Sequence, residues 1–79
     1  PKHLVTKEYY AEILGVVGKQ EIDAFETGVT LDDGYKTLPS KLELISVDGD
    51  RSSVKIWLKE GKYRQIRRMF QSFGMEVIY

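Results

Sequence analysis

The chain has 79 residues, and its twelve Lys and Arg residues balance twelve Asp and Glu residues, so its formal net charge is zero. This length fits one small domain, and the zero net charge excludes any argument for nucleic-acid binding from overall charge. The absence of cysteine excludes disulfides and cysteine-based metal sites. The sequence has no apolar run long enough for a membrane span or signal peptide. His3 is the only histidine and has no partners at ligand spacing, so we expect no metal site.

The first half of the chain predicts a strand followed by a short helix. Alternating residues indicate a strand over Lys7–Leu14, with Tyr9 and Tyr10 on opposite faces. Lys19–Thr27 has helical spacing, and Gly28 after it is a typical C-terminal stop.

Two adjacent aspartates then lie in a turn. The residues Asp32, Asp33 and Gly34 separate two short apolar runs, 29–31 and 35–38, which predicts a hairpin. Paired carboxylates are one arrangement for acid–base chemistry, but an Asp-Gly turn more often leaves its acids in water. We therefore interpret these aspartates as turn residues.

A second hairpin is predicted over strands 41–47 and 53–59. Val54, Ile56 and Leu58 alternate with Lys55, Trp57 and Lys59 on the second of these strands. Trp57 has an aromatic face on which a base could stack, but partial burial beside the stems of neighbouring lysines is the more common arrangement.

An amphipathic helix and a final strand complete the pattern. The apolar positions, at i, i+3, i+4 and i+7, are Ile66, Met69, Phe70 and Phe73. Gly74 provides the stop, and a last strand begins at Met75. On the helix, Arg64 and Arg68 lie opposite the apolar stripe and Arg67 lies on its flank. We expect an α+β fold: an antiparallel-rich sheet with two helices packed on it.

Basic residues are concentrated where the second hairpin turns into this helix. Five of the twelve basic residues lie between positions 59 and 68, with one acid among them. Taken alone, such a run is most often a solvated helix face. A basic strand–glycine–helix junction, however, presents backbone N–H groups and cations together, and this arrangement can hold phosphate.

Residues 60–70, Glu-Gly-Lys-Tyr-Arg-Gln-Ile-Arg-Arg-Met-Phe, resemble the C-terminal motif of the ribosomal RNA pseudouridine synthases, in the branch that includes the small-subunit enzyme. The strand that opens with Lys7-Glu8-Tyr9 is similar to a Lys-x-Tyr element of the same family. The resemblance covers nearly the whole chain. It implies a fold that forms part of the pseudouridine synthase catalytic domain.

The resemblance also implies roles for individual residues. Tyr9 matches the tyrosine that stacks on the target base, although a half-buried strand aromatic is the ordinary interpretation of its position. Arg67 matches the residue that pairs with the catalytic aspartate. Lys62, Arg64 and Arg68 become candidates for contacts with RNA phosphates, and Arg64 occupies a position that is often histidine in the family.

The catalytic aspartate of the family has no match in this sequence. It belongs to a Gly-Arg-Leu-Asp-like motif that precedes the tyrosine strand, whereas the aspartates here occupy helix or turn contexts. We therefore expect residues 1–79 to be the C-terminal portion of a catalytic domain without its nucleophile-bearing half, and inactive alone. The resemblance implies no cofactor, ribosomal RNA as the partner, a cytoplasmic location and a monomeric parent protein.

Two other functions remain open at this stage. Basic and aromatic residues suffice for a non-catalytic RNA-binding module. A basic amphipathic helix can also dock on a protein partner or an anionic membrane. The domain's own sheet needs the apolar stripe of the helix, which argues against the second alternative.

Overall fold

The computed structural model describes residues 6–59 and 63–78. Its elements are β1 (Lys7–Leu14), α1 (Lys19–Thr27), β2 (Lys41–Asp48), β3 (Arg51–Leu58), α2 (Tyr63–Gln71) and β4 (Glu76–Val77). The predicted bounds of β1 and α1 are confirmed, and those of β2 and β3 differ by one or two residues.

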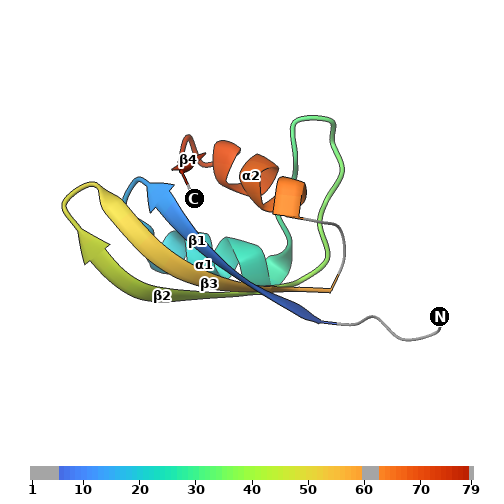
Figure 1. The fold of residues 1–79 in the computed structure, drawn as a ribbon. Helices are drawn as coiled ribbons and strands as arrows, with labels where there is room; N and C mark the ends of the chain where they lie inside the picture. Colours follow the sequence, from blue (N-terminus) through green and yellow to red (C-terminus); the bar gives the residue numbers. More distant parts are fainter. Residues whose placement is uncertain (1–5, 60–62, 79) are drawn as a thin grey trace.

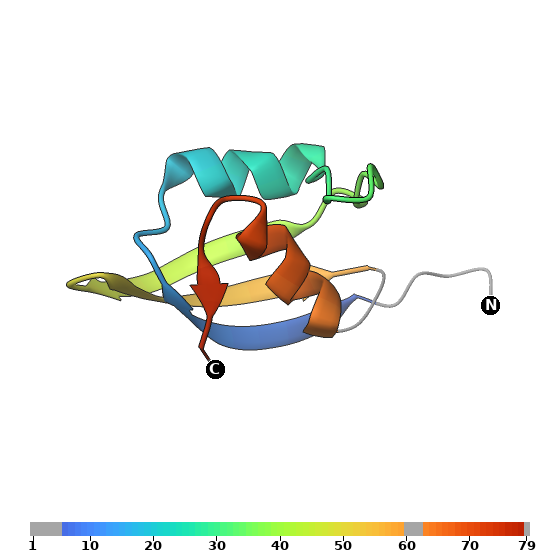
Figure 2. The same cartoon turned by 90° about the horizontal axis from the view of Figure 1, so that it is seen from above.

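The four strands form one antiparallel sheet in the order β2-β3-β1-β4. β1 pairs with β3 over its full length, from Lys7 opposite Leu58 to Leu14 opposite Arg51. A bulge between Leu44 and Ser46 interrupts the pairing of β2 with β3. Both helices lie on the core side of the sheet, with α1 alongside β2 and α2 over β1 and β3 (Figures 1 and 2). The predicted α+β architecture is confirmed.

Strand alternation decides which side chains form the core. Ala11 and Ile13 on β1 and Val54 and Ile56 on β3 are fully buried beneath the helices. Tyr10, next to Ala11, is exposed on the opposite face of the sheet. This segregation follows from the two-residue period of a strand, which sends successive side chains to opposite faces.

The stripe of α2 completes this core. Ile66, Met69 and Phe70 are fully buried, as predicted. The ring of Phe70 lies 5.2 Å from that of Phe25 on α1 and 6.2 Å from the ring of the partly buried Phe73. These aromatic contacts join the two helices, which are otherwise far apart in the sequence.

Buried polar groups fix the connections between elements. The hydroxyl of Ser52 donates to the Gly15 carbonyl at 2.7 Å and accepts from the Val17 amide at 2.9 Å. After α1, the chain turns at Gly28, where φ is 103° and an added Cβ would lie 2.5 Å from the Thr37 carbonyl oxygen. Only glycine fits such a left-handed, crowded position.

The predicted hairpin at 29–38 is wrong in one respect. Its turn is present, since the Gly34 amide donates to the Leu31 carbonyl at 2.9 Å, but the flanks form an isolated bridge between Thr30 and Lys36 and no full strands. Two backbone hydrogen bonds join the flanks, from the Leu31 amide to the Tyr35 carbonyl at 2.8 Å and from the Thr37 amide to the Val29 carbonyl at 2.9 Å. Val29 and Leu31 are also buried, so both backbone pairing and side-chain packing hold this segment. The last predicted strand is also shorter than 75–79, because β4 comprises two residues.

Candidate functional site

One end of the sheet brings together two of the regions singled out from the sequence. β1 begins where β3 ends, and α2 starts over this same end of the core face (Figures 1 and 2). β1 carries Tyr9 and α2 carries the arginines. The fold therefore places the candidate aromatic and cationic residues on neighbouring elements.

Tyr9 lies on the core face of β1, in the same alternation as Ala11 and opposite Ile56 on β3. It is half-buried and packs against the core cluster. The interpretation as a half-buried strand aromatic describes this packing correctly. It leaves part of the side chain exposed on the helix-covered side, where α2 begins.

Arg64 and Arg67 are both exposed on α2. In the part of the chain that the structure describes, neither guanidinium forms an ion pair. Arginine stays charged and presents five donors in a planar fork that matches carboxylate and phosphate groups. These two side chains are therefore the cations of the helix best able to take such a partner. Lys62, the other candidate on this approach, lies outside the described residues.

Arg68 differs from its neighbour because it already has two carboxylate partners. Its Nη2 lies 2.7 Å from Asp32 Oδ1 and 3.1 Å from Asp33 Oδ2, and its side chain is 39% exposed. We expected Arg68 to be exposed, because it lies opposite the apolar stripe; it is half-exposed and connects α2 to the turn. With two acids beside it, its charge is largely neutralised.

This cluster also shifts the protonation of its members. The backbone N–H of Tyr35, and then the guanidinium of Arg68, lower the pKa of Asp33. Hydrogen bonds to Asp32 and Asp33 raise the pKa of Arg68. Both shifts favour the charged forms, so the ion pair persists at neutral pH.

Gln65 is a residue that the sequence analysis passed over. Its side-chain Nε2 is buried, and no acceptor for it exists among residues 6–59 and 63–78. An unmade hydrogen bond at a buried amide costs about 1–3 kcal/mol. Its burial could have been predicted from the sequence, because Gln65 lies four residues before the buried Met69 and residues at i and i+4 share a helix face. The amide lies between Arg64 and Arg67 in the sequence and is a further donor at the site.

Asp23, Asp48 and Asp50 lie on other parts of the fold. Asp48 is the last residue of β2 and Asp50 lies in the turn before β3, at the end of the sheet opposite the start of β1. Asp23 pairs with Lys19 on α1 at 3.7 Å. No cluster of three His, Cys, Asp or Glu residues suited to a metal ion occurs within the described ranges. Asp23 and Asp50 lie in the helix and turn contexts expected from the sequence, whereas Asp48, expected in the turn, ends the strand β2.

Comparison with known proteins defines the class of this fold. No family model matches the chain. A solved structure described as a pseudouridylate synthase superposes with a TM-score of 0.80 at 30% identity, over 92% of this chain and 30% of that one. The fold is thus that of part of a pseudouridine synthase.

Curated proteins that are similar to this chain agree. The chain is 35% identical over all of its length to the uncharacterized RNA pseudouridine synthase YtzG of Bacillus subtilis, and covers 33% of it. It is 39% identical to ribosomal large subunit pseudouridine synthase B of the same organism and 34% identical to ribosomal small subunit pseudouridine synthase A of Vibrio cholerae, covering 99% of this chain and 32% of each relative. The chain is therefore similar to part of proteins named as pseudouridine synthases, which confirms the resemblance seen in its sequence. It spans about a third of their length.

Proposed function

We propose that this chain forms the C-terminal portion of the catalytic domain of an RNA pseudouridine synthase, which isomerises uridine to pseudouridine in ribosomal RNA. The observation that carries the proposal is the placement of an exposed Arg67, without an ion pair in the described structure, on a helix that starts over the strand bearing Tyr9. The homology supports the reaction class, since the relatives are named for it.

The reaction requires a uridine to leave its stack before the bond between base and ribose is broken. The exposed part of Tyr9 offers a surface on which the extruded base stacks. Partial burial of the same side chain in the core limits its motion. A fixed aromatic surface positions the base at a lower entropic cost than a mobile one.

Arg67 supplies what the missing carboxylate needs. An aspartate that attacks the ribose or removes a proton from it must be ionised, and an adjacent guanidinium lowers its pKa and fixes its orientation. We assign that aspartate to a part of the protein outside this chain. Arg67 is then the residue by which this portion completes the active site.

The remaining cations contribute to RNA binding. Arg64 and Lys62 are proposed to contact phosphates, whereas the acids beside Arg68 reduce its contribution. The proposal includes no cofactor, a cytoplasmic location and a monomeric parent protein. No helix in the described parts of the chain is long and apolar enough to cross a membrane.

The test is tritium release from ribosomal RNA labelled with 5-tritiated uridine. A longer protein that contains this chain should release tritium, and the 79-residue chain alone should not. Binding of RNA without release by the longer protein would favour the alternative, a non-catalytic RNA-binding module. Release by the 79-residue chain alone would place the nucleophile among its own aspartates.

A further inference from the structure

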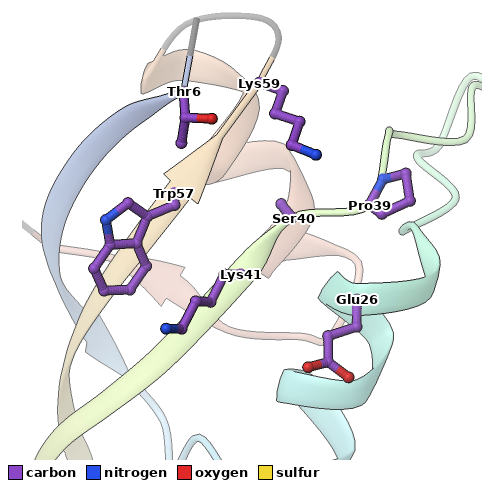
Figure 3. A pocket seen from close by; sticks show the side chains of 7 residues that line it. All are labelled: Thr6, Glu26, Pro39, Ser40, Lys41, Trp57 and Lys59. Atoms are coloured by element: carbon purple, nitrogen blue, oxygen red, sulfur yellow. The ribbon is translucent and has the colours of Figure 1, made fainter. Parts of the chain in front are cut away.

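A concave surface is lined by residues other than Tyr9 and Arg67. It is an open groove of about 600 Å³ at the start of β2, and its lining includes Thr6, Glu26, Ser40, Lys41, Trp57 and Lys59 (Figure 3). Trp57 is paired with Glu8 across β1 and β3, one step along from the pair of Tyr9 and Ile56. Because successive residues of a strand point to opposite faces, Trp57 and Tyr9 are on opposite faces of the sheet.

The indole of Trp57 is held in a defined orientation. Its Nε1 donates a hydrogen bond to Glu8 Oε1 at 3.1 Å. Glu8 is itself paired with Lys55, whose Nζ lies 3.6 Å from the other carboxylate oxygen. Trp57 is only half-buried, so its ring combines a fixed position with an accessible surface. Stacking of unpaired bases on proteins uses aromatic side chains with these two properties.

Two lysines flank this ring. Lys41 Nζ lies 5.0 Å from the centroid of the indole, and Lys59 extends from the end of β3 toward Pro39 and Ser40 in Figure 3. Both lysines are exposed, and neither forms an ion pair within the described residues. A cation–π contact at an exposed site contributes about 0.5–1 kcal/mol, so Lys41 can move onto a phosphate at small cost.

The lining also includes Pro39 and three polar residues, Thr6, Glu26 and Ser40. Ser40 and Thr6 carry hydroxyls that can donate or accept, and the Ser40 hydroxyl is 3.4 Å from the Phe25 carbonyl oxygen. Among the described residues, Glu26 is the carboxylate on the lining, and it lies on α1, across the start of β2 from Trp57 (Figure 3). A carboxylate there repels phosphate but accepts hydrogen bonds from base amines or ribose hydroxyls.

We infer that this groove binds an unpaired nucleotide of single-stranded RNA, with its base stacked on Trp57 and a phosphate held by Lys41 and Lys59. The aromatic surface suits a base, the two lysines suit a phosphate, and the hydroxyls suit a ribose. The choice of RNA as the occupant rests on the proposed function. The groove lies at the start of β2, between Trp57 on the face of the sheet away from Tyr9 and Glu26 on α1, and is proposed as a contact additional to that of Tyr9 and Arg67.

The sequence provides its own reporter, because Trp57 is the only tryptophan. Its fluorescence is measured while a short oligouridylate is added to the 79-residue chain at several salt concentrations. We expect quenching that weakens as salt rises, because phosphate contacts release counterions. Lys41→Ala and Lys59→Ala should each weaken binding several-fold and reduce the salt dependence.

Lys19→Ala is the matched control. Lys19 is 88% exposed at the start of α1, pairs with Asp23 and is not part of the groove lining. Lys19→Ala removes one positive charge, as Lys41→Ala and Lys59→Ala do, and should leave the affinity for oligouridylate unchanged. Circular dichroism of each variant shows that the fold is kept, since all three lysines are exposed.

Three results would overturn the inference: no quenching by oligouridylate, equal weakening by Lys19→Ala, or equal quenching by an oligoglutamate of the same length. The last would show recognition of charge without a nucleotide. Tritium release by the longer protein separates this inference from the proposed function. If the longer protein releases tritium but oligouridylate does not quench Trp57 in the 79-residue chain, only the inference about the groove is wrong. If Trp57 is quenched but the longer protein releases no tritium, only the proposed catalytic function is wrong.

Discussion

Arg68 on α2 and Asp32 in the turn at 31–34 are 36 residues apart in the sequence, yet their side chains approach to 2.7 Å. This contact, with the second one to Asp33, separates the two adjacent arginines of the helix into different roles. Arg68 holds the turn against α2, and Arg67 remains available to a partner outside this chain. The arrangement leads to different expectations for the two residues.

Arg67→Ala in a longer, active protein should lower the rate of pseudouridine formation by several orders of magnitude. The catalytic aspartate would lose the cation that orients it and keeps it ionised. Arg67→Lys should keep part of the activity, because lysine retains the charge but not the planar fork. Tritium release measures all three proteins. A fully active Arg67→Ala protein would remove this residue from the site.

Arg64→Glu should weaken RNA binding more than Arg68→Glu. Arg64 has no ion pair in the described structure, whereas two carboxylates already neutralise Arg68. The double reversal should abolish most of the affinity, and binding should fall as salt rises. Fluorescence anisotropy of labelled single-stranded RNA gives these affinities. If neither salt nor the double reversal changes them, the phosphate contacts are misassigned.

The ion pair also predicts a pH effect. The pKa of Asp33 is lowered in the folded protein, so its carboxylate stabilises the fold above the ordinary pKa of aspartate. That contribution is lost as the pH falls through the lower, folded value. Arg68→Ala should raise the pKa of Asp33 toward the ordinary value without a large change in stability, because the pair is exposed. An NMR titration of the Asp33 carboxyl carbon measures the shift, and an unchanged pKa would contradict the assignment.

Phe70→Ala should cost about 3–5 kcal/mol of unfolding free energy. Phe70 is fully buried and contacts both Phe25 and Phe73, so its removal leaves a cavity between the helices. In so small a domain this loss approaches the whole stability. Urea denaturation followed by circular dichroism tests it, with Phe73→Ala at the partly buried position as the milder comparison. A Phe70→Ala protein as stable as wild type would show that the core is misassigned.

Local patterns were sufficient to predict most of this fold. Strict alternation around Ala11 and Ile56 and the helical spacing of Ile66 and Phe70 each select one face, so burial follows from sequence period alone. Val29 and Leu31 were harder to interpret. They have strand-like composition and lie in a hairpin, but the hairpin pairs only at an isolated bridge, and their burial in the core depends on residues far away in the chain.

The candidate site was predictable to a smaller extent. Exposure of Arg64 follows from its place opposite the apolar stripe. The pairing of Arg68 with the turn does not, because charge contacts between residues 36 positions apart leave no periodic signal. The groove at Trp57 was also beyond sequence reasoning, since its lining comes from segments that only the tertiary fold brings together.

The short length of β4 has a consequence for assembly. β4 pairs with β1 only at Ile13 and Leu14, whereas β3 pairs with β1 along its whole length. Within the described residues, Lys7 and Glu8 therefore have a strand partner on the β3 side alone. A strand from another part of a longer protein can extend the sheet at this short segment, because the peptide groups of a sheet edge hydrogen-bond to any extended backbone.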